Sequence, residues 1–192
     1  ECQRLCFAVA QKYYAREDMA RTALEAYTAA IQRYHGRATL IGYYGYGNFG
    51  DEMTLRSLIE VLPYHRLYIP HAKKVPPPPV PKGSKKRLHY TGRYLGVLYA
   101  IMRSREVIFG GGTLFQNSTS TRSLLYYCLV AFFARIFGKR LRLLAGGVDT
   151  IRGTLPRAIA RKALRCFDAL SVRTEMDRNN LAKLIGSQRA TH

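Results

Sequence analysis

The feature that most constrains this chain is a glycine-rich stretch between a short apolar run and a helical pattern. Residues 40–52 read Leu-Ile-Gly-Tyr-Tyr-Gly-Tyr-Gly-Asn-Phe-Gly-Asp-Glu, and apolar residues then recur at helical spacing as far as Leu62. A strand, a glycine turn and a helix in this order are the opening unit of a parallel α/β domain. The glycines let the backbone approach a ligand closely at the carboxyl end of the strand.

Two acids, Asp51 and Glu52, stand at the start of the predicted helix. They complement the positive end of the helix dipole, but they would repel a phosphate placed there. The glycines at 45, 47 and 50 also fit the Gly-x-Gly-x-x-Gly dinucleotide pattern, although no acid follows the next strand at the usual place. We interpret Asp51 and Glu52 as groups that hold or deprotonate sugar hydroxyls. The alternative is a helix cap with a dipole-complementing acid, and the two roles can coexist.

A second glycine stretch follows another apolar run. Residues 107–109 read Val-Ile-Phe, and residues 110–117 then read Gly-Gly-Gly-Thr-Leu-Phe-Gln-Asn. Residues 118–123, which read Ser-Thr-Ser-Thr-Arg-Ser, lead into an apolar helical segment that ends near Phe137. A helix N-terminus preceded by glycines and hydroxyls favours an anion or sugar hydroxyls.

With both motifs in this order, the chain resembles the polysaccharide pyruvyl transferase family over about residues 38–186. That family carries Gly-Tyr-Tyr-Gly-x-x-Asn-x-Gly-Asp-Glu after its first strand, and Gly-Gly-Gly-x-Leu-x-Gln-Asp running into Thr-Ser-x-Arg-Ser. The resemblance implies a transferase that moves the pyruvyl group of phosphoenolpyruvate onto a sugar of a cell-wall or exopolysaccharide as a ketal. It implies phosphoenolpyruvate as the donor, a saccharide or lipid-linked saccharide as the acceptor, and neither a cofactor nor a metal.

The resemblance and the residues together give a set of candidate site residues. Arg173 follows the last predicted strand, where the family has an Arg, and the resemblance implies that it contacts phosphoenolpyruvate. Thr174 replaces the Asp that follows this Arg in the family. The alternative for Arg173 is a surface Arg at the start of a helix. Asn117 likewise replaces an Asp, and Ser120 has a helix cap as its alternative role. The predicted substrate-binding residues are Asn48, Gly50, Asp51, Glu52, Gly111, Gly112, Gln116, Ser120, Arg122 and Arg173.

The predicted fold class is α/β, a Rossmann-like parallel sheet with helices on both faces. The resemblance makes residues 36–192 the N-terminal domain of a two-domain enzyme of glycosyltransferase-B-like architecture. Residues 1–35 lie outside the resemblance, and apolar residues at helical spacing predict a helical extension there. The general-acid His is expected in the absent C-terminal half, so this chain alone is expected to be inactive. The predicted strands are 38–43, 66–69, 106–109, 140–145 and 169–172, and the predicted helices are 52–62, 94–103, 123–137, 155–167 and 175–184.

The charge of the chain is uneven. The formal net charge is +19, and residues 82–167 hold 17 Lys and Arg against 2 Asp and Glu. Such a field attracts anions, among them phosphorylated substrates and anionic lipid headgroups. No nucleic-acid motif accompanies it, so no nucleic-acid partner is expected. The alternative functions are a nucleotide-sugar glycosyltransferase of the same architecture and a basic membrane- or nucleic-acid-binding module.

Three further patterns bear on structure. Residues 76–87, a proline run and then a basic run, are expected to form neither sheet nor helix. Cys128 falls in the apolar helical segment, where a buried thiol is expected. The cysteine spacing favours a reducing, cytoplasmic compartment. Peripheral contact with the inner face of the membrane is an alternative within that compartment. His65, His71 and His89 lie in or beside loops and are interpreted as solvated side chains.

Overall fold

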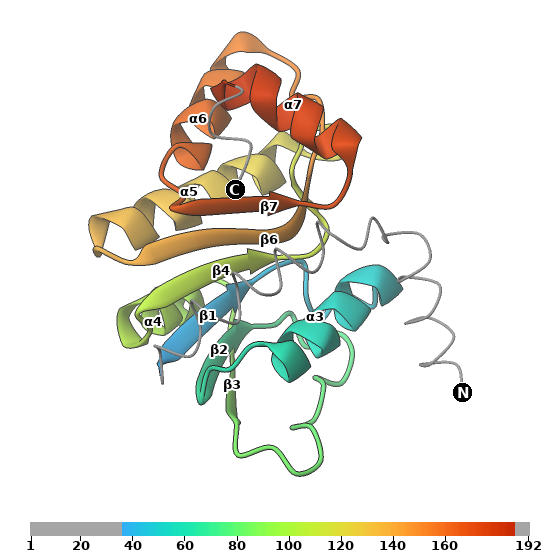
Figure 1. Cartoon of the computed structure of the whole chain (residues 1–192), viewed down its shortest axis with the longest axis vertical. Coiled ribbons are helices and arrows are strands. Elements are labelled where there is room, and N and C mark those ends of the chain that lie inside the picture. Colours follow the sequence, from blue (N-terminus) through green and yellow to red (C-terminus); the bar gives the residue numbers. More distant parts are fainter. Residues whose placement is uncertain (1–35, 187–192) are drawn as a thin grey trace. The chain divides into compact units, whose positions relative to one another are not determined.

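The computed structural model describes residues 36–186, and Figure 1 shows how their helices and strands are arranged. The predicted helical extension over residues 1–35 lies outside the described residues. Within them, seven parallel strands form one sheet flanked by helices, which confirms the predicted α/β, Rossmann-like class. The strands are β1 (Arg37–Ile41), β2 (Arg66–Pro70), β3 (Arg87–Thr91), β4 (Glu106–Gly110), β5 (Thr113–Phe115), β6 (Arg140–Val148) and β7 (Ala169–Val172).

Four helices connect strands, a fifth follows the last strand of the described residues, and together they cover both faces of the sheet. They are α3 (Phe49–Val61), α4 (Leu95–Arg103), α5 (Thr121–Ile136), α6 (Thr154–Leu164) and α7 (Glu175–Ile185). Helix α3 covers one face, and α4 and α5 pack side by side on the opposite face, as Figure 1 shows. Helix α6 packs against α5, and α7 packs against α6 and the strands β6 and β7. This is the arrangement that right-handed crossovers between parallel strands produce.

The strand order places a change of direction between β1 and β4. The order is β3-β2-β1-β4-β6, so the chain first builds outward from β1 through β2 to β3 and then returns to β4 on the other side of β1. In open α/β sheets such a reversal leaves a crevice at the carboxyl ends of the two central strands. The first glycine motif follows β1 and the second follows β4, so both motifs lie at this reversal.

Two strands differ from the sequence pattern. Strand β3 pairs in parallel with β2 at one edge of the sheet, and it begins at Arg87, so the prediction that placed Arg87 in a basic loop was wrong. Strand β5 lies inside the second glycine motif and pairs with the end of β6. Strand β6 itself runs to Val148, beyond the predicted end at Ala145, and its last residues pair with β5. Its register shifts between Leu143 and Gly146, where Ala145 takes a φ of 46°.

The proline and basic segment before β3 forms neither helix nor strand from Pro76 to Lys86, as predicted. It is nevertheless held against the domain. The hydroxyl of Tyr90 in β3 donates a hydrogen bond to the carbonyl of Pro78. The ammonium of Lys86 donates to the carbonyls of Ile59 and Glu60, near the end of α3. A cation at this end of a helix also complements its dipole.

The core lies between the sheet and the helices α5, α6 and α7. Phe109, Phe115 and Phe167 pack their rings against one another, with centroids 5.0 Å apart for the first and last of these residues. Burying one such side chain stabilises the fold by roughly 1.5–3 kcal/mol. Cys128 lies among these apolar side chains as a free, fully buried thiol, which confirms its prediction. Among residues 36–186, no helix has the length and apolar character needed to cross a bilayer.

Candidate functional site

The glycine loop after β1 is tied to the loops that follow the neighbouring strands. The buried Tyr44 donates its hydroxyl proton to the carbonyl of Gly110 at the end of β4, over 2.6 Å. The carbonyl of Tyr44 accepts a hydrogen bond from the backbone N–H of Ala72, which follows β2, over 3.0 Å. Burial raises the pKa of Tyr44 well above its usual value, so its hydroxyl stays a donor. The loop is therefore fixed against both of its neighbours at the carboxyl edge of the sheet.

Asp51 occupies the first turn of α3 and is buried at the switch point, with 5% of its surface exposed. Its Oδ2 accepts a hydrogen bond from Nδ2 of Asn48, the N-cap residue, over 2.6 Å. Burial raises the pKa of Asp51 above its usual value of 3.8, the guanidinium of Arg173 lowers it, and Glu52 raises it. Two predicted site residues, Asn48 and Asp51, are thus in direct contact, with Gly50 between them in the chain.

The second motif forms a two-glycine kink directly opposite Asp51. Gly111 and Gly112 have φ values of 70° and 62°, in the left-handed region that favours glycine. A Cβ at Gly112 would lie 2.5 Å from Oδ1 of Asp51, and a Cβ at Gly111 would lie 2.5 Å from Cγ2 of Thr54 in α3. Both positions of the kink therefore need glycine for two reasons, which are the left-handed dihedral angles and the close approach of α3.

Arg173 follows β7 and reaches the same edge of the sheet. Its Nη2 donates a hydrogen bond to Oγ1 of Thr113, the first residue of β5, over 3.0 Å. The same nitrogen lies against Gly147 in β6, where a Cβ would collide with it. The electrostatic effect of Arg173 on Asp51 shows that the guanidinium also lies near that carboxylate. The structure thus brings together residues from α3, the kink, β5, β6 and the end of β7.

Beside Arg173, the two residues that depart from the pattern of the family that the chain resembles, Thr174 and Asp177, form the cap of α7. Thr174 is the N-cap of α7, and its hydroxyl accepts a hydrogen bond from the backbone N–H of Asp177 over 3.1 Å. The carboxylate of Asp177 accepts in return from the N–H of Thr174 over 3.2 Å, which completes a capping box. The same carboxylate accepts from the N–H of Val148 in β6 over 2.8 Å. These bonds fix the segment that carries Arg173.

The buried His71 and the half-buried Glu52 form a pair beside the glycine loop. Oε1 of Glu52 accepts a hydrogen bond from the N–H of Gly45 over 2.5 Å, and Oε2 lies 3.8 Å from Nε2 of His71. His71 is only 1% exposed, so its interpretation as a solvated side chain was wrong. Burial lowers the pKa of His71, while Glu52 raises it. Glu52 is thus engaged with the loop itself, and the position of His71 directly after β2 was the signal in the sequence.

The loop after β5 closes mostly on itself. Oε1 of Gln116 accepts hydrogen bonds from the hydroxyl of Ser118 and the N–H of Thr119, and Nε2 of Gln116 donates to Oγ1 of Thr119 over 2.7 Å. Asn117 brackets the next loop, because its amide group donates to the carbonyl of Arg152 and accepts from the N–H of Arg152. The amide that replaces the family's carboxylate therefore joins two loops of the site edge.

The remaining predicted residues, Ser120 and Arg122, lie at the start of α5. Ser120 is the N-cap residue by position, but its hydroxyl makes no capping hydrogen bond. Arg122 is exposed in the first turn. The structure places both residues on the carboxyl side of the sheet without joining them to the cluster of Asp51 and Arg173. Within the described part of the chain, no three His, Cys, Asp or Glu side chains gather in a way that could hold a metal ion.

A doubly wound sheet with two glycine motifs, a buried carboxylate and a guanidinium at its switch point defines an α/β ligand-binding domain. Comparison with known families specifies this class further. The model of the polysaccharide pyruvyl transferase family matches residues 48–186. The chain therefore belongs to the polysaccharide pyruvyl transferase family, a family of transferases. Neither the curated proteins nor the solved structures give a match.

The contact between Gly112 and Asp51 predicts an unequal response to two similar substitutions. Gly138 has a φ of 65° and open space where a Cβ would stand, so Gly138→Ala suffers only the left-handed strain, roughly 1–2 kcal/mol. Gly112→Ala adds a collision with Asp51 to the same strain. Urea unfolding followed by circular dichroism should therefore show a clearly larger loss of stability for Gly112→Ala. Equal losses would contradict the close approach of Gly112 and Asp51.

The raised pKa of Asp51 predicts that Asp51→Asn gives a gain in folding stability that depends on pH. The folded protein holds the Asp51 proton at pH values where the unfolded chain has released it, so this carboxyl lowers stability as the pH rises from 3.8 through the folded pKa. Asparagine does not ionise. The free energy of unfolding of the variant, relative to the unsubstituted protein, should thus rise with pH across this window and be flat below it. A difference independent of pH would contradict the buried environment of Asp51.

Proposed function

We propose that this chain is the donor-binding domain of an enzyme that transfers the pyruvyl group of phosphoenolpyruvate to a sugar. The observation that carries the proposal is the convergence of Asp51, Gly112, Thr113 and Arg173 at the switch point. Phosphoenolpyruvate is a cytoplasmic metabolite, so we place the reaction there. The acceptor is a sugar of a cell-wall or exopolysaccharide, free or linked to a lipid.

The donor carries a carboxylate and a phosphate, and a guanidinium fork suits both groups. Arg173 is exposed, and its hydrogen bond within residues 36–186 goes from one nitrogen to Thr113. The other N–H groups are available to an anion at the site edge. The missing side chain of Gly147 lets the guanidinium of Arg173 lie against β6 at this edge of the sheet. A donor held there would lie close to the Asp51 carboxylate.

Asp51 supports the acceptor side of the proposal. Ketal formation joins two sugar oxygens to C2 of the pyruvyl group, expels inorganic phosphate and turns the methylene of the donor into a methyl group. Of the two hydroxyl protons that the sugar loses, one balances the new methyl group and the other leaves with the phosphate. A carboxylate whose pKa is raised by burial accepts a hydroxyl proton more readily than an ordinary Asp. We assign this role to Asp51, because the carboxylate of Glu52 already accepts a hydrogen bond from Gly45 and pairs with His71.

The rival with the same fold is a nucleotide-sugar glycosyltransferase. The family membership favours the pyruvyl transferase. A thermal-shift titration with phosphoenolpyruvate and with uridine diphosphate separates the two. Protection by phosphoenolpyruvate alone supports the proposal, and protection by the nucleotide alone overturns it.

The Arg173 assignment predicts a selective loss of donor binding. Losing a charge-assisted bond to the anion should weaken phosphoenolpyruvate binding by about tenfold or more in Arg173→Gln, as measured by isothermal titration calorimetry. Arg178→Gln is the matched control, because Arg178 is an exposed Arg in the neighbouring helix α7. Equal binding by the two variants would remove Arg173 from the donor site.

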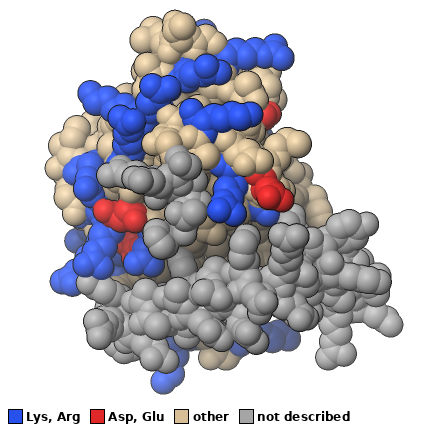
Figure 2. Space-filling model, turned by 45° about the horizontal axis from the view of Figure 1, so that its top comes forward, with Lys and Arg blue, Asp and Glu red and all other residues tan. Residues whose placement is uncertain are grey.

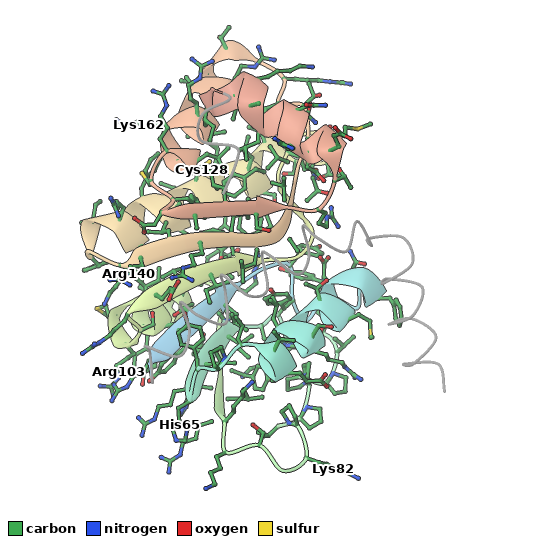
Figure 3. The ribbon with its side chains drawn as sticks, in the orientation of Figure 1. His65, Lys82, Arg103, Cys128, Arg140 and Lys162 are labelled. Atoms are coloured by element: carbon green, nitrogen blue, oxygen red, sulfur yellow. The ribbon has the colours of Figure 1, made fainter. Side chains whose placement is uncertain are left out.

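A second observation favours contact with an anionic membrane. Helices α4 and α5 contain no Asp or Glu, and each exposes a stripe of large apolar side chains. The most exposed are Leu95 at 82%, Ile136 at 76%, Met102 at 55% and Leu129 at 54%. Arg103 ends α4 and Arg140 follows α5, and Figure 3 shows both at the same end of the sheet. Apolar stripes bordered by cations suit an anionic lipid surface.

This surface predicts vesicle binding through α5. The protein should sediment with phosphatidylglycerol vesicles but not with phosphatidylcholine vesicles, and Ile136→Asp should reduce the bound fraction. Val61→Asp is the matched control, because Val61 is 57% exposed on α3, on the opposite face of the sheet. Binding that both substitutions weaken equally, or neither, would refute a membrane contact through α4 and α5.

A further inference from the structure

A cluster of aromatic and cationic side chains adjoins the switch point, and none of the proposed donor contacts uses it. The rings of Tyr43 and Tyr46 in the glycine loop are stacked, with centroids 4.1 Å apart and planes 7° apart. Lys74 lies 5.1 Å from the Tyr46 ring centroid. The Arg93 guanidinium lies between two rings, 4.9 Å from the centroid of Tyr46 and 5.0 Å from that of Tyr126. We call these five residues the tyrosine–cation platform.

The platform is built from loops at the carboxyl edge of the sheet. Its two stacked rings belong to the glycine loop that Tyr44 anchors to the end of β4. Lys74 follows β2, and its backbone N–H donates to the carbonyl of Gly45 over 2.9 Å. Arg93 precedes α4, and its carbonyl accepts the hydroxyl proton of Tyr126 over 3.0 Å. The geometry of the platform is thus fixed by backbone bonds and does not depend on its side chains alone.

A buried hydroxyl lies beside the platform. Tyr127 in α5 is 2% exposed, and within the described residues its hydroxyl has no hydrogen-bond partner. Burial raises the pKa of Tyr127, the charge of Arg93 lowers it, and Asp51 and Tyr43 both raise it. The ring of Tyr127 packs edge-on against that of Tyr126 in the platform, with centroids 5.2 Å apart. An unpaired buried hydroxyl is costly, and it indicates a position where a ligand supplies the missing partner.

We propose that the tyrosine–cation platform is the acceptor subsite, and that it binds a sugar ring carrying a phosphate group. This inference rests on the proposed function, which supplies the sugar. The exposed part of Tyr43 packs against the apolar face of the ring, while Lys74 and Arg93 hold the phosphate. The ring then extends toward Tyr127 and Asp51, which brings its hydroxyls to the carboxylate.

The platform offers a separate contact to each part of this ligand, the sugar ring and the phosphate. Tyr43 keeps 38% of its surface exposed, so an aromatic surface remains open to a ring although Tyr46 covers part of it. Lys74 is exposed, and its ammonium, which lies over the Tyr46 ring, is accessible to an anion. The formal net charge of the chain is +19, and Figure 2 shows more Lys and Arg than Asp and Glu over the described part of the face in view, so the general field also favours an anion.

The test compares four probes by isothermal titration calorimetry on the 192-residue chain. They are N-acetylglucosamine, inorganic phosphate, N-acetylglucosamine 1-phosphate, and the same sugar on a polyprenyl diphosphate in nanodiscs. We expect the sugar phosphate, soluble or lipid-linked, to bind about tenfold more tightly than either part alone. Whichever of the two binds better identifies the source of the acceptor. Equal binding of inorganic phosphate and both sugar phosphates would overturn the proposal.

Substitutions locate the subsite. Arg93→Gln and Lys74→Gln should each weaken binding of the tighter sugar phosphate by about tenfold. Arg178→Gln is the matched control, because Arg178 is an exposed Arg in α7, a helix that contributes no residue to the platform. Tyr43→Ala should remove the preference for the sugar phosphate over inorganic phosphate. Unchanged binding in Arg93→Gln and Lys74→Gln would refute the subsite.

The same variants separate this inference from the proposed function. Phosphoenolpyruvate should bind the Arg93→Gln and Lys74→Gln variants as it binds the unsubstituted protein, since its proposed contact is Arg173. If phosphoenolpyruvate binds and the platform substitutions have no effect, the subsite fails and the donor site stands. If the platform binds sugar phosphate and phosphoenolpyruvate does not bind at all, the proposed function fails.

Discussion

The close approach of the Asp51 carboxylate to the backbone of Gly112 is the constraint from which the rest of the site follows. It allows the first turn of α3 to lie against the end of β4, and it demands two consecutive residues without side chains in the left-handed region. The kink that results redirects the chain after β4 and lets it resume pairing, as β5, with the end of β6. Because the carboxylate is buried there, its charge acts on groups that in water would be screened.

The surrounding loops hold this contact in place from three sides. Tyr44 joins the glycine loop to the end of β4, and Asn117 joins the loops that follow β5 and β6. On the third side, the capping box of α7 and the bond from Val148 to Asp177 fix the segment that presents Arg173. Each bond satisfies a backbone or side-chain polar group that the carboxyl edge of the sheet would otherwise leave unpaired. These bonds fix the framework of the site, while the side chains of Arg173 and Lys74 remain exposed.

The sequence predicts the α/β class and the longer strands better than it predicts the short strands and the contacts between loops. Long apolar runs and glycine turns are local signals, so the α/β class and five of the strands follow from the pattern. Strand β3 is a short edge strand with a weak pattern, and β5 is three residues hidden in a glycine motif. The burial of His71 and the pairing of Asn117 with Arg152 depend on which loops the fold brings together. No local pattern contains that information, and the aromatic platform could not be predicted for the same reason.

The most direct test of a shared site is the pKa of the Asp51 carboxyl group, measured by carbon-detected nuclear magnetic resonance during a pH titration. Burial raises this pKa in the folded protein, and the Arg173 guanidinium opposes the rise. Arg173→Gln should therefore raise the Asp51 pKa, whereas Arg178→Gln, on the neighbouring helix, should leave it where it is. An Asp51 pKa that does not respond to Arg173→Gln would show that the carboxylate and the guanidinium do not share one site.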